Sequence, residues 1–101
     1  MPYCLNESSE YIPDATLPFN QYGWLNLTNL LFIDTPAGVG YSINNDSKYQ
    51  FNDVNTAKDN VFALKYFFSN KFPFYAKSIF YIAGESYAGK YVPDLAMKIL
   101  Y

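Results

Sequence analysis

Two short apolar segments separated by one amphipathic stretch place the tightest constraint on how this chain of 101 residues can fold. Residues 30–34 are apolar up to a final aspartate, and residues 78–83 are apolar after an initial serine. Apolar runs of this length are typical of strands that are buried on both faces of a parallel sheet. We therefore expect residues 30–34 and 78–83 to form two buried parallel strands.

The stretch between the two segments predicts an amphipathic helix. Either Asn52 or Asp53 can cap its start, and the helix should end near Asn70, ahead of Pro73. Apolar residues recur at spacings of three and four, which places them on one face: Val54, Ala57, Val61, Leu64 and Phe68. Strand, helix and strand in this order make a βαβ unit with a right-handed crossover.

The rest of the chain divides around this unit. Residues 1–29 carry scattered prolines and no apolar period, so we expect an irregular lead-in before a βαβα core over residues 30–101. Residues 35–42 should form a loop, because a proline and two glycines exclude regular structure there. A second helix should follow Ser86, with Pro93 able to start a new segment and a bend. Because two strands cannot enclose an α/β sheet, more strands must flank these two.

The segment 78–89 reads as a strand, a tight turn that holds Ser86, and the start of a helix, which is the layout of a nucleophile elbow. The small residues Gly84 and Ala88 let strand and helix approach closely at the turn. The serine then projects above the carboxyl end of the sheet, where α/β folds bind ligands. The backbone N–H of Tyr87 is the natural donor to an oxyanion beside Ser86.

A serine hydroxyl is a weak nucleophile until a neighbouring base, almost always histidine, takes its proton. The chain contains no histidine. Asp94 follows Ser86 in the right chain order for a catalytic acid, but it lies in the same helical region and should be a surface carboxylate. No glycine-rich loop before Leu30 offers a second oxyanion donor.

Composition and charge exclude several classes of function. Half of the residues are apolar and 21% are aromatic, which is a core-forming composition. The net charge of −2 comes without a basic run, so nucleic acid is not an expected partner. No apolar stretch is long enough for a transmembrane helix, and the first 20 residues do not read as a signal peptide. No phosphate loop or metal-ligand cluster is present, so we expect neither a cofactor nor a metal.

The single cysteine is compatible with either a reducing or an oxidising cellular compartment. The single cysteine, Cys4, is either a free thiol in a cytosolic protein or an extracellular cysteine whose partner lies outside this chain. Three glycosylation sequons, at Asn6, Asn26 and Asn45, favour the secreted interpretation. The sequon at Asn26 borders a predicted strand, where a glycan has little room.

Three ordered blocks of sequence resemble the serine carboxypeptidases. Residues 84–93 (Gly-Glu-Ser-Tyr-Ala-Gly-Lys-Tyr-Val-Pro) resemble the nucleophile segment of that family, and residues 29–42 resemble a strand and loop further upstream. Residues 20–24 resemble the family's Asn-Pro-Tyr-Ser-Trp, with departures at Gln21 and Gly23. The resemblance runs from about Asn20 to the C-terminus, with matching order and spacing.

The resemblance implies a partial α/β-hydrolase fold and the removal of C-terminal residues from peptides and proteins through an acyl-enzyme on Ser86. The N–H of Tyr87 would be one oxyanion donor. Glu85 would hydrogen-bond the free α-carboxylate of the substrate, and because two such groups share a proton, peptides should bind more tightly at acidic pH. The parent enzyme would be vacuolar, lysosomal or secreted.

Members of this family are several times longer than this chain, and their catalytic aspartate and histidine lie well downstream of the serine. We therefore expect residues 1–101 to be an internal fragment of one hydrolase domain that is inactive alone. One alternative is an esterase or a carboxypeptidase-like acyltransferase on the same scaffold, although Glu85 argues against a plain esterase. The other is a truncated, non-catalytic product, which the absence of histidine favours for this chain as written.

Overall fold

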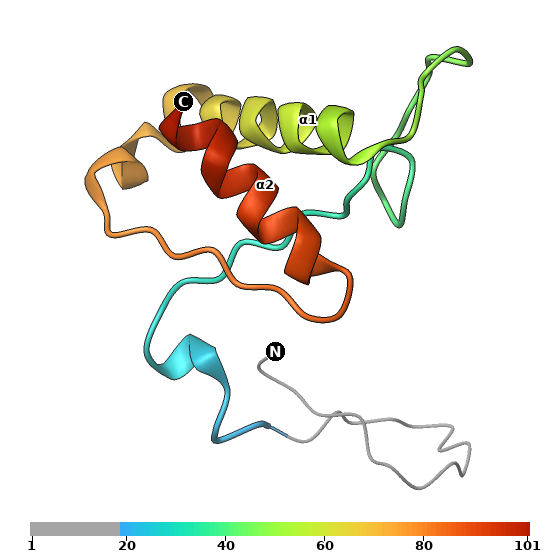
Figure 1. Ribbon diagram of the computed structural model, residues 1–101. Coiled ribbons are helices and arrows are strands. Elements are labelled where there is room, and N and C mark those ends of the chain that lie inside the picture. The colour runs from blue at the N-terminus through green and yellow to red at the C-terminus, as the bar shows by residue number, and fades with distance from the viewer. Residues whose placement is uncertain (1–18) are drawn as a thin grey trace, which may run out of the picture. The chain divides into compact units, whose positions relative to one another are not determined.

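The computed structural model describes residues 19–101 and separates the chain into two compact units, Met1–Phe32 and Ile33–Tyr101. The described part of the first unit contains one short 3₁₀ turn, η1 (Trp24–Asn26). The second unit is helical (Figure 1). Its elements in chain order are α1 (Asp53–Tyr66), the π-helical turn η2 (Phe67–Lys71), the 3₁₀ turn η3 (Pro73–Lys77) and α2 (Ala88–Leu100).

Helix α1 begins where the sequence predicts. Asn52 is the N-cap, and its side-chain oxygen accepts a hydrogen bond from the backbone N–H of Asn55 at 2.9 Å. The helical path continues from α1 through η2 to Lys71, close to the end expected near Asn70, and stops before Pro73. The cap and the approximate end of the predicted helix are therefore confirmed.

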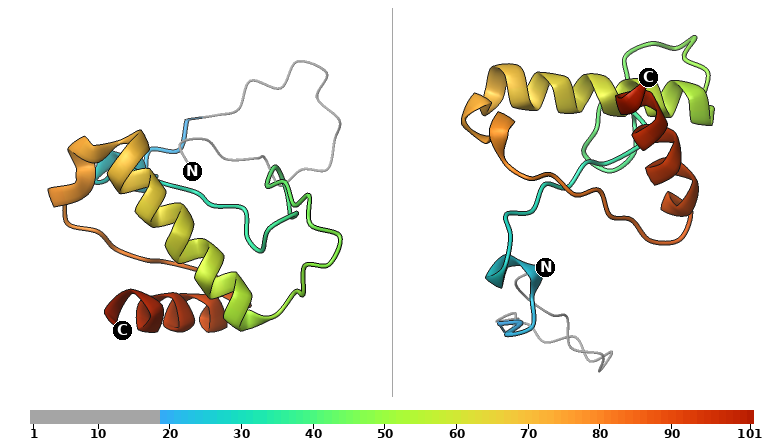
Figure 2. Two further views of the ribbon diagram at one scale, coloured as in Figure 1. Left: turned by 90° about the horizontal axis from the view of Figure 1, so that it is seen from above. Right: turned by 60° about the vertical axis from the view of Figure 1, so that its left-hand side comes forward.

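The core of the second unit lies between α1 and α2, which pack against each other in both views (Figure 2). Ala57 and Leu64 of the predicted stripe are buried there together with Leu95 of α2, whereas Val54 is exposed. Helix α2 runs without a break through Pro93, where the sequence suggests a new segment. Because the N–H that proline lacks would bond to the carbonyl of Gly89, in the first turn, only one bond near the helix start is lost.

The predicted parallel βαβ unit is wrong, and with it the predicted partial α/β-hydrolase fold. None of the residues from 19 to 101 lies in a β-strand. A strand exists through ladder hydrogen bonds to a neighbour. Residues 30–33 and 79–83 make no backbone–backbone hydrogen bond within the described part of the chain, so both segments are irregular.

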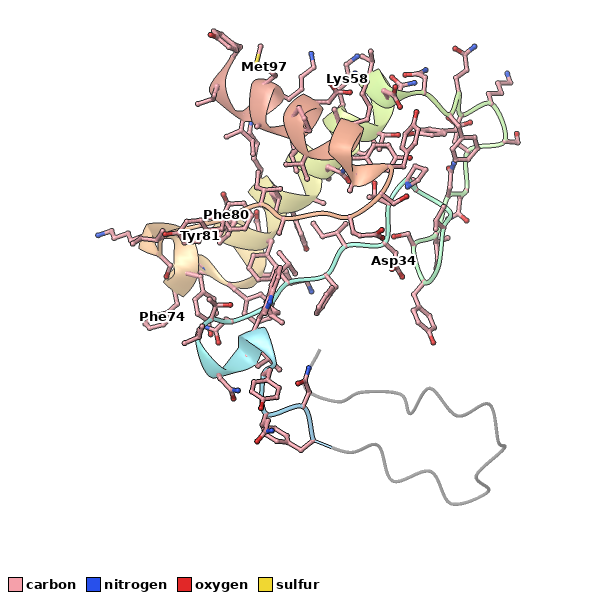
Figure 3. All side chains as sticks on the ribbon, turned by 60° about the horizontal axis from the view of Figure 1, so that its bottom comes forward. Asp34, Lys58, Phe74, Phe80, Tyr81 and Met97 are labelled. Carbon is pink, nitrogen blue, oxygen red and sulfur yellow. The ribbon has the colours of Figure 1, made fainter. Side chains whose placement is uncertain are left out.

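The prediction that both segments are buried on two faces is also wrong. Phe32 is 71% exposed, Ile79 is 83% exposed and Tyr81 is 80% exposed, because nothing in the described part of the chain covers them. The ring of Phe80 has a partner and packs edge-on against Phe68, with the ring centroids 5.2 Å apart. Tyr81 and the exposed Phe74 project at the outer edge of the second unit (Figure 3). The apolar pattern correctly located two hydrophobic segments, but it could not show whether other residues of this chain would bury them.

The loop that follows residue 34 is ordered by one aspartate. The Asp34 carboxylate accepts from the backbone N–H of Tyr41 at 2.8 Å, and its carbonyl accepts from the Ser42 hydroxyl at 2.6 Å. Gly40 has φ 57°, and a Cβ there would lie 3.1 Å from Asp34 Oδ1 and closer still to the rest of the carboxylate. The expectation that residues 35–42 form a loop is confirmed, and glycine supplies the positive φ that this loop needs.

Side-chain hydrogen bonds attach both loops before α1 to that helix. The hydroxyl of Thr35 donates to Asn60 Oδ1 at 2.9 Å, which satisfies the side-chain oxygen of a buried polar residue. The hydroxyl of Tyr49, in the polar loop 43–52, donates to the carboxylate of Asp59. Both acceptors lie on α1, so this helix holds the preceding loops in place.

Within residues 19–101, no helix combines the length and the hydrophobicity needed to cross a membrane. The same residues contain no group of three or more His, Cys, Asp and Glu side chains that could hold a metal ion.

The Tyr49–Asp59 pair predicts a specific loss of stability in alkali. The hydrogen bond to Asp59, followed by partial burial, raises the pKa of Tyr49 to about 12. An unfolded tyrosine has a pKa of about 10. Between these values the unfolded chain has lost a proton that the folded chain keeps, so the free energy of unfolding falls as the pH rises. Asp59→Asn should shift the last tyrosine ionisation to lower pH, measured by tyrosinate absorbance. Asp46→Asn, a carboxylate that accepts from the backbone of Lys48, should leave it unchanged.

Candidate functional site

The segment before α2 forms a tight turn centred on Ser86. Ser86 has φ 58°, and among residues 19–101 no other residue except glycine has a positive φ. A left-handed backbone costs a residue with a side chain roughly 1–2 kcal/mol and is concentrated at functional sites. Successive bonds from Ala88 N–H to the Glu85 carbonyl (3.1 Å) and from Gly89 N–H to the Ser86 carbonyl (2.9 Å) lead directly into the helix.

Close packing behind the turn depends on Gly84. A Cβ at this position would lie 3.0 Å from Val92 Cγ2 and closer still to the Cβ of Ala88. Real Cβ atoms essentially never approach other atoms this closely, so Gly84 is fixed by sterics. The predicted need for small residues at 84 and 88 is confirmed.

The three predicted site residues lie side by side at this turn and are exposed: Glu85, Ser86 and Tyr87. Within the described part of the chain, no hydrogen bond occupies the Ser86 hydroxyl, the Glu85 carboxylate or the Tyr87 backbone N–H. The N–H of Tyr87, next to the start of α2, is therefore free to donate to a ligand anion. The turn itself presents a serine hydroxyl and a backbone N–H, and the chain has no histidine that could act as a base.

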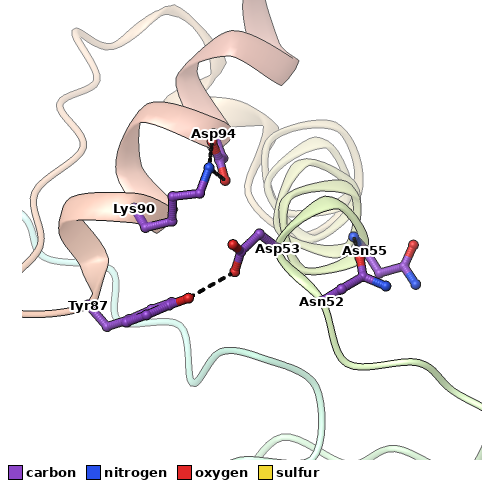
Figure 4. Close-up of polar contacts among 6 residues, drawn as sticks. All are labelled: Asn52, Asp53, Asn55, Tyr87, Lys90 and Asp94. Carbon is purple, nitrogen blue, oxygen red and sulfur yellow. Dashed lines mark hydrogen bonds and ion pairs between the residues drawn. The ribbon is translucent and has the colours of Figure 1, made fainter.

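The side chain of Tyr87 reaches across to α1. Its hydroxyl donates to Asp53 Oδ1 at 3.4 Å (Figure 4). Its ring packs edge-on against Tyr91, with the ring centroids 5.0 Å apart. The negative charge of Asp53, followed by desolvation and the hydrogen bond itself, raises the pKa of Tyr87. The phenol is therefore protonated at neutral pH and acts as a donor.

Asp94 is engaged within its own helix, as expected for a surface carboxylate. It pairs with Lys90 at 2.8 Å in an i,i+4 arrangement (Figure 4), an interaction that contributes little stability when exposed. The same two side chains line a groove of about 300 Å³ between α1 and α2, together with Asp53, Val54, Ala57, Met97 and Lys98. No residue of the turn from 84 to 87 lines this groove.

The predicted modification sites are only partly described. Asn6 and Cys4 lie outside the described residues. Asn26 lies in η1, where its side-chain nitrogen donates to the carbonyl of Gln21 at 2.7 Å. Asn45 is exposed in the polar loop before α1. Glycosylation at all three sequons remains a prediction.

Two contacts of α1 were not foreseen from the sequence. Asp53 was considered only as a helix cap, and its contact with Tyr87 spans 34 residues, so no local pattern could indicate it. Asn60 was not considered, although a polar residue next to the apolar stripe is a signal that a buried partner is required. That partner is Thr35.

A serine held at positive φ directly before a helix is the arrangement by which serine hydrolases expose their nucleophile. A model of the serine carboxypeptidase family matches residues 8–101 of this chain. The chain therefore belongs to the serine carboxypeptidase family.

Curated relatives agree with this family and are much longer. The chain is 45% identical to the lysosomal protective protein of Mus musculus, over 87% of this chain and 19% of that protein. It is 50% identical to serine carboxypeptidase-like 26 of Arabidopsis thaliana, over 86% of this chain and 20% of that protein. Serine carboxypeptidase 24 of Arabidopsis thaliana is 45% identical over 97% of this chain. The chain spans about a fifth of the length of these relatives.

Two glycines five residues apart should respond oppositely to alanine. Gly84→Ala should lower the free energy of unfolding by about 1–3 kcal/mol, because the new Cβ would overlap Ala88. Gly89→Ala should raise it by up to about 1 kcal/mol, because no atom lies within 4 Å of the new Cβ and alanine favours a helix. Urea unfolding followed by circular dichroism measures both. Equal effects of the two substitutions would contradict the close packing behind the turn.

Proposed function

We propose that this chain carries the nucleophile region of a serine-type carboxypeptidase that removes C-terminal residues from peptides and proteins. The observation that carries the proposal is the exposed Ser86 at φ 58°, directly before α2, inside the residues that the family model matches. Strain of this kind persists only where the surrounding packing enforces it, and here Gly84 and Ala88 do so.

Ser86 Oγ attacks the carbonyl carbon of the last peptide bond, and the carbonyl oxygen takes up the negative charge. The unoccupied N–H of Tyr87 stabilises that charge as a hydrogen-bond donor that needs no reorganisation. The C-terminal residue leaves as a free amino acid, and water then hydrolyses the ester on Ser86. Because the chain has no histidine, we propose that the rest of the protein supplies the base that takes the serine proton and then gives it to the leaving amine.

Glu85 gives the site its preference for a chain end. Its carboxylate is exposed and has no hydrogen-bond partner among the described residues, so a ligand can reach it. The negative charge of Glu85 would repel an oxyanion that forms beside Ser86. The same carboxylate can share one proton with the α-carboxylate of a peptide, which makes that pair favourable. A peptide held by such a pair binds most tightly at acidic pH, where the shared proton is retained. This supports an acidic or secretory location, namely the vacuole, the lysosome or the exterior, and the relatives include a protein named as lysosomal.

A segment exchange tests the role of Ser86. The matching segment of serine carboxypeptidase 24 from Arabidopsis thaliana is replaced by this chain, and release of the C-terminal residue from a blocked dipeptide is measured. Ser86→Ala should lower kcat by more than about 10³-fold, because the covalent step is lost. Ser47→Ala, at an exposed loop serine, should leave the rate unchanged. An active exchange protein that tolerates Ser86→Ala would contradict the proposal.

Glu85 makes a separate prediction in the same exchange protein. KM for the dipeptide should rise from acidic to neutral pH, because the shared proton is lost there. Glu85→Gln should keep binding at neutral pH and flatten that dependence, since an amide donates a hydrogen bond without a proton from solution. Asp46→Asn, at an exposed loop carboxylate, serves as the matched control. A pH profile of KM that Glu85→Gln leaves unchanged would exclude this role.

A further inference from the structure

A side-chain hydrogen bond joins the first turn of α1 to the serine turn. Asn52 already caps the helix, with its side-chain oxygen 2.9 Å from the backbone nitrogen of Asn55, so the Asp53 carboxylate is not needed as the cap. The carboxylate turns instead toward the hydroxyl of Tyr87, 3.4 Å from Oδ1 (Figure 4). This contact links two elements that lie 34 residues apart.

Tyr87 is held at three points, and burial is not what holds it. Its side chain is 60% exposed, so packing alone leaves the ring room to move. The phenol reaches Asp53, the ring edge meets Tyr91, and the backbone carbonyl accepts from Lys90 N–H at 2.9 Å. The backbone N–H of Tyr87 has no partner among the described residues. The direction in which this N–H points is therefore set by the contacts that hold the rest of the residue.

We propose that Asp53 is a positioning residue for the reaction assigned to Ser86: through the Tyr87 phenol it fixes the Ser86–Tyr87 peptide unit, so that the Tyr87 N–H stays aimed at the developing oxyanion. The inference rests on the proposed function. Asp53 touches neither the substrate nor the reacting atoms. Its effect comes from preorganisation, because an oxyanion donor is effective only when it is already in place and small displacements are costly.

The charges around Asp53 fit this role. The negative charge of Asp53 raises the pKa of Tyr87, so the phenol keeps the proton that it donates. The ammonium group of Lys90 is paired with Asp94 at 2.8 Å, which raises the pKa of Lys90, and the charge of Asp53 adds only a smaller effect in the same direction. The Asp53 carboxylate therefore remains available to Tyr87.

The first test needs no activity and uses the exchange protein. Asp53→Ala should move the amide resonance of Tyr87 and lower the pKa of its phenol, measured by nuclear magnetic resonance. Asp53→Asn should preserve the amide shift, because the side-chain oxygen still accepts a hydrogen bond. Asp46→Asn, at an exposed loop carboxylate, should move neither signal. A Tyr87 amide that does not respond to Asp53→Ala overturns the inference.

The second test uses the exchange protein. Asp53→Ala and Tyr87→Phe should each lower kcat roughly three- to tenfold, the effect of one modest hydrogen bond, with KM unchanged. A donor that acts only in the transition state produces this pattern. The double variant should be no slower than the slower single variant, because the two side chains act as one unit.

Asp53→Asn separates positioning from helix stability. It removes the charge that the N-terminus of α1 favours but keeps the acceptor, so kcat should stay within about twofold of the unaltered protein. Asp46→Asn, at the exposed loop carboxylate, should also leave kcat unchanged. The inference is overturned if Asp53→Ala or Tyr87→Phe raises KM instead of lowering kcat. It is also overturned if the effects of the two single substitutions on kcat multiply in the double variant. Failure of the proposed function looks different: Ser86→Ala would then leave hydrolysis intact, or the unaltered exchange protein would be inactive while the Tyr87 amide still reports the contact.

Discussion

The packing of Gly84 against Ala88 and Val92 is the constraint on which the serine turn depends. Because Gly84 has no side chain, its backbone can lie close to Ala88 and to the side chain of Val92 in α2. In the turn that follows, Ser86 lies in the left-handed region, and the N–H of Tyr87 has no acceptor in the described chain. A larger residue at 84 would move α2 away and would release the strain that exposes the serine.

Helix α1 organises what surrounds this turn. Three separate segments attach to it through side-chain hydrogen bonds: Thr35 to Asn60, Tyr49 to Asp59 and Tyr87 to Asp53. Its apolar face packs against α2, and its polar positions tie down the loops on either side. One helix therefore provides a small core and also the anchors for the chain that precedes Ser86, and Asp53 links this helix to the serine turn.

The sequence pattern correctly predicted those features that depend only on residues close together in the chain. The cap at Asn52, the buried Ala57 and Leu64, and the small residues behind Ser86 follow from side-chain chemistry and spacing within a few residues, and the structure confirms them. The strands at 30–34 and 78–83 failed for the opposite reason. A strand needs hydrogen bonds and cover from a neighbour, and apolar character says nothing about whether the described chain holds that neighbour.

The sequence by itself determined the family, the serine turn and the identity of Glu85, Ser86 and Tyr87 as candidate site residues, because these depend on the order of residues along one short segment. Only the tertiary structure decided that Ser86 is held at positive φ, that the apolar segments stand uncovered in the described chain, and that Asp53 reaches Tyr87. The physical reason is distance along the chain: a contact between residues 34 apart depends on how two helices pack, and no sequence period encodes it.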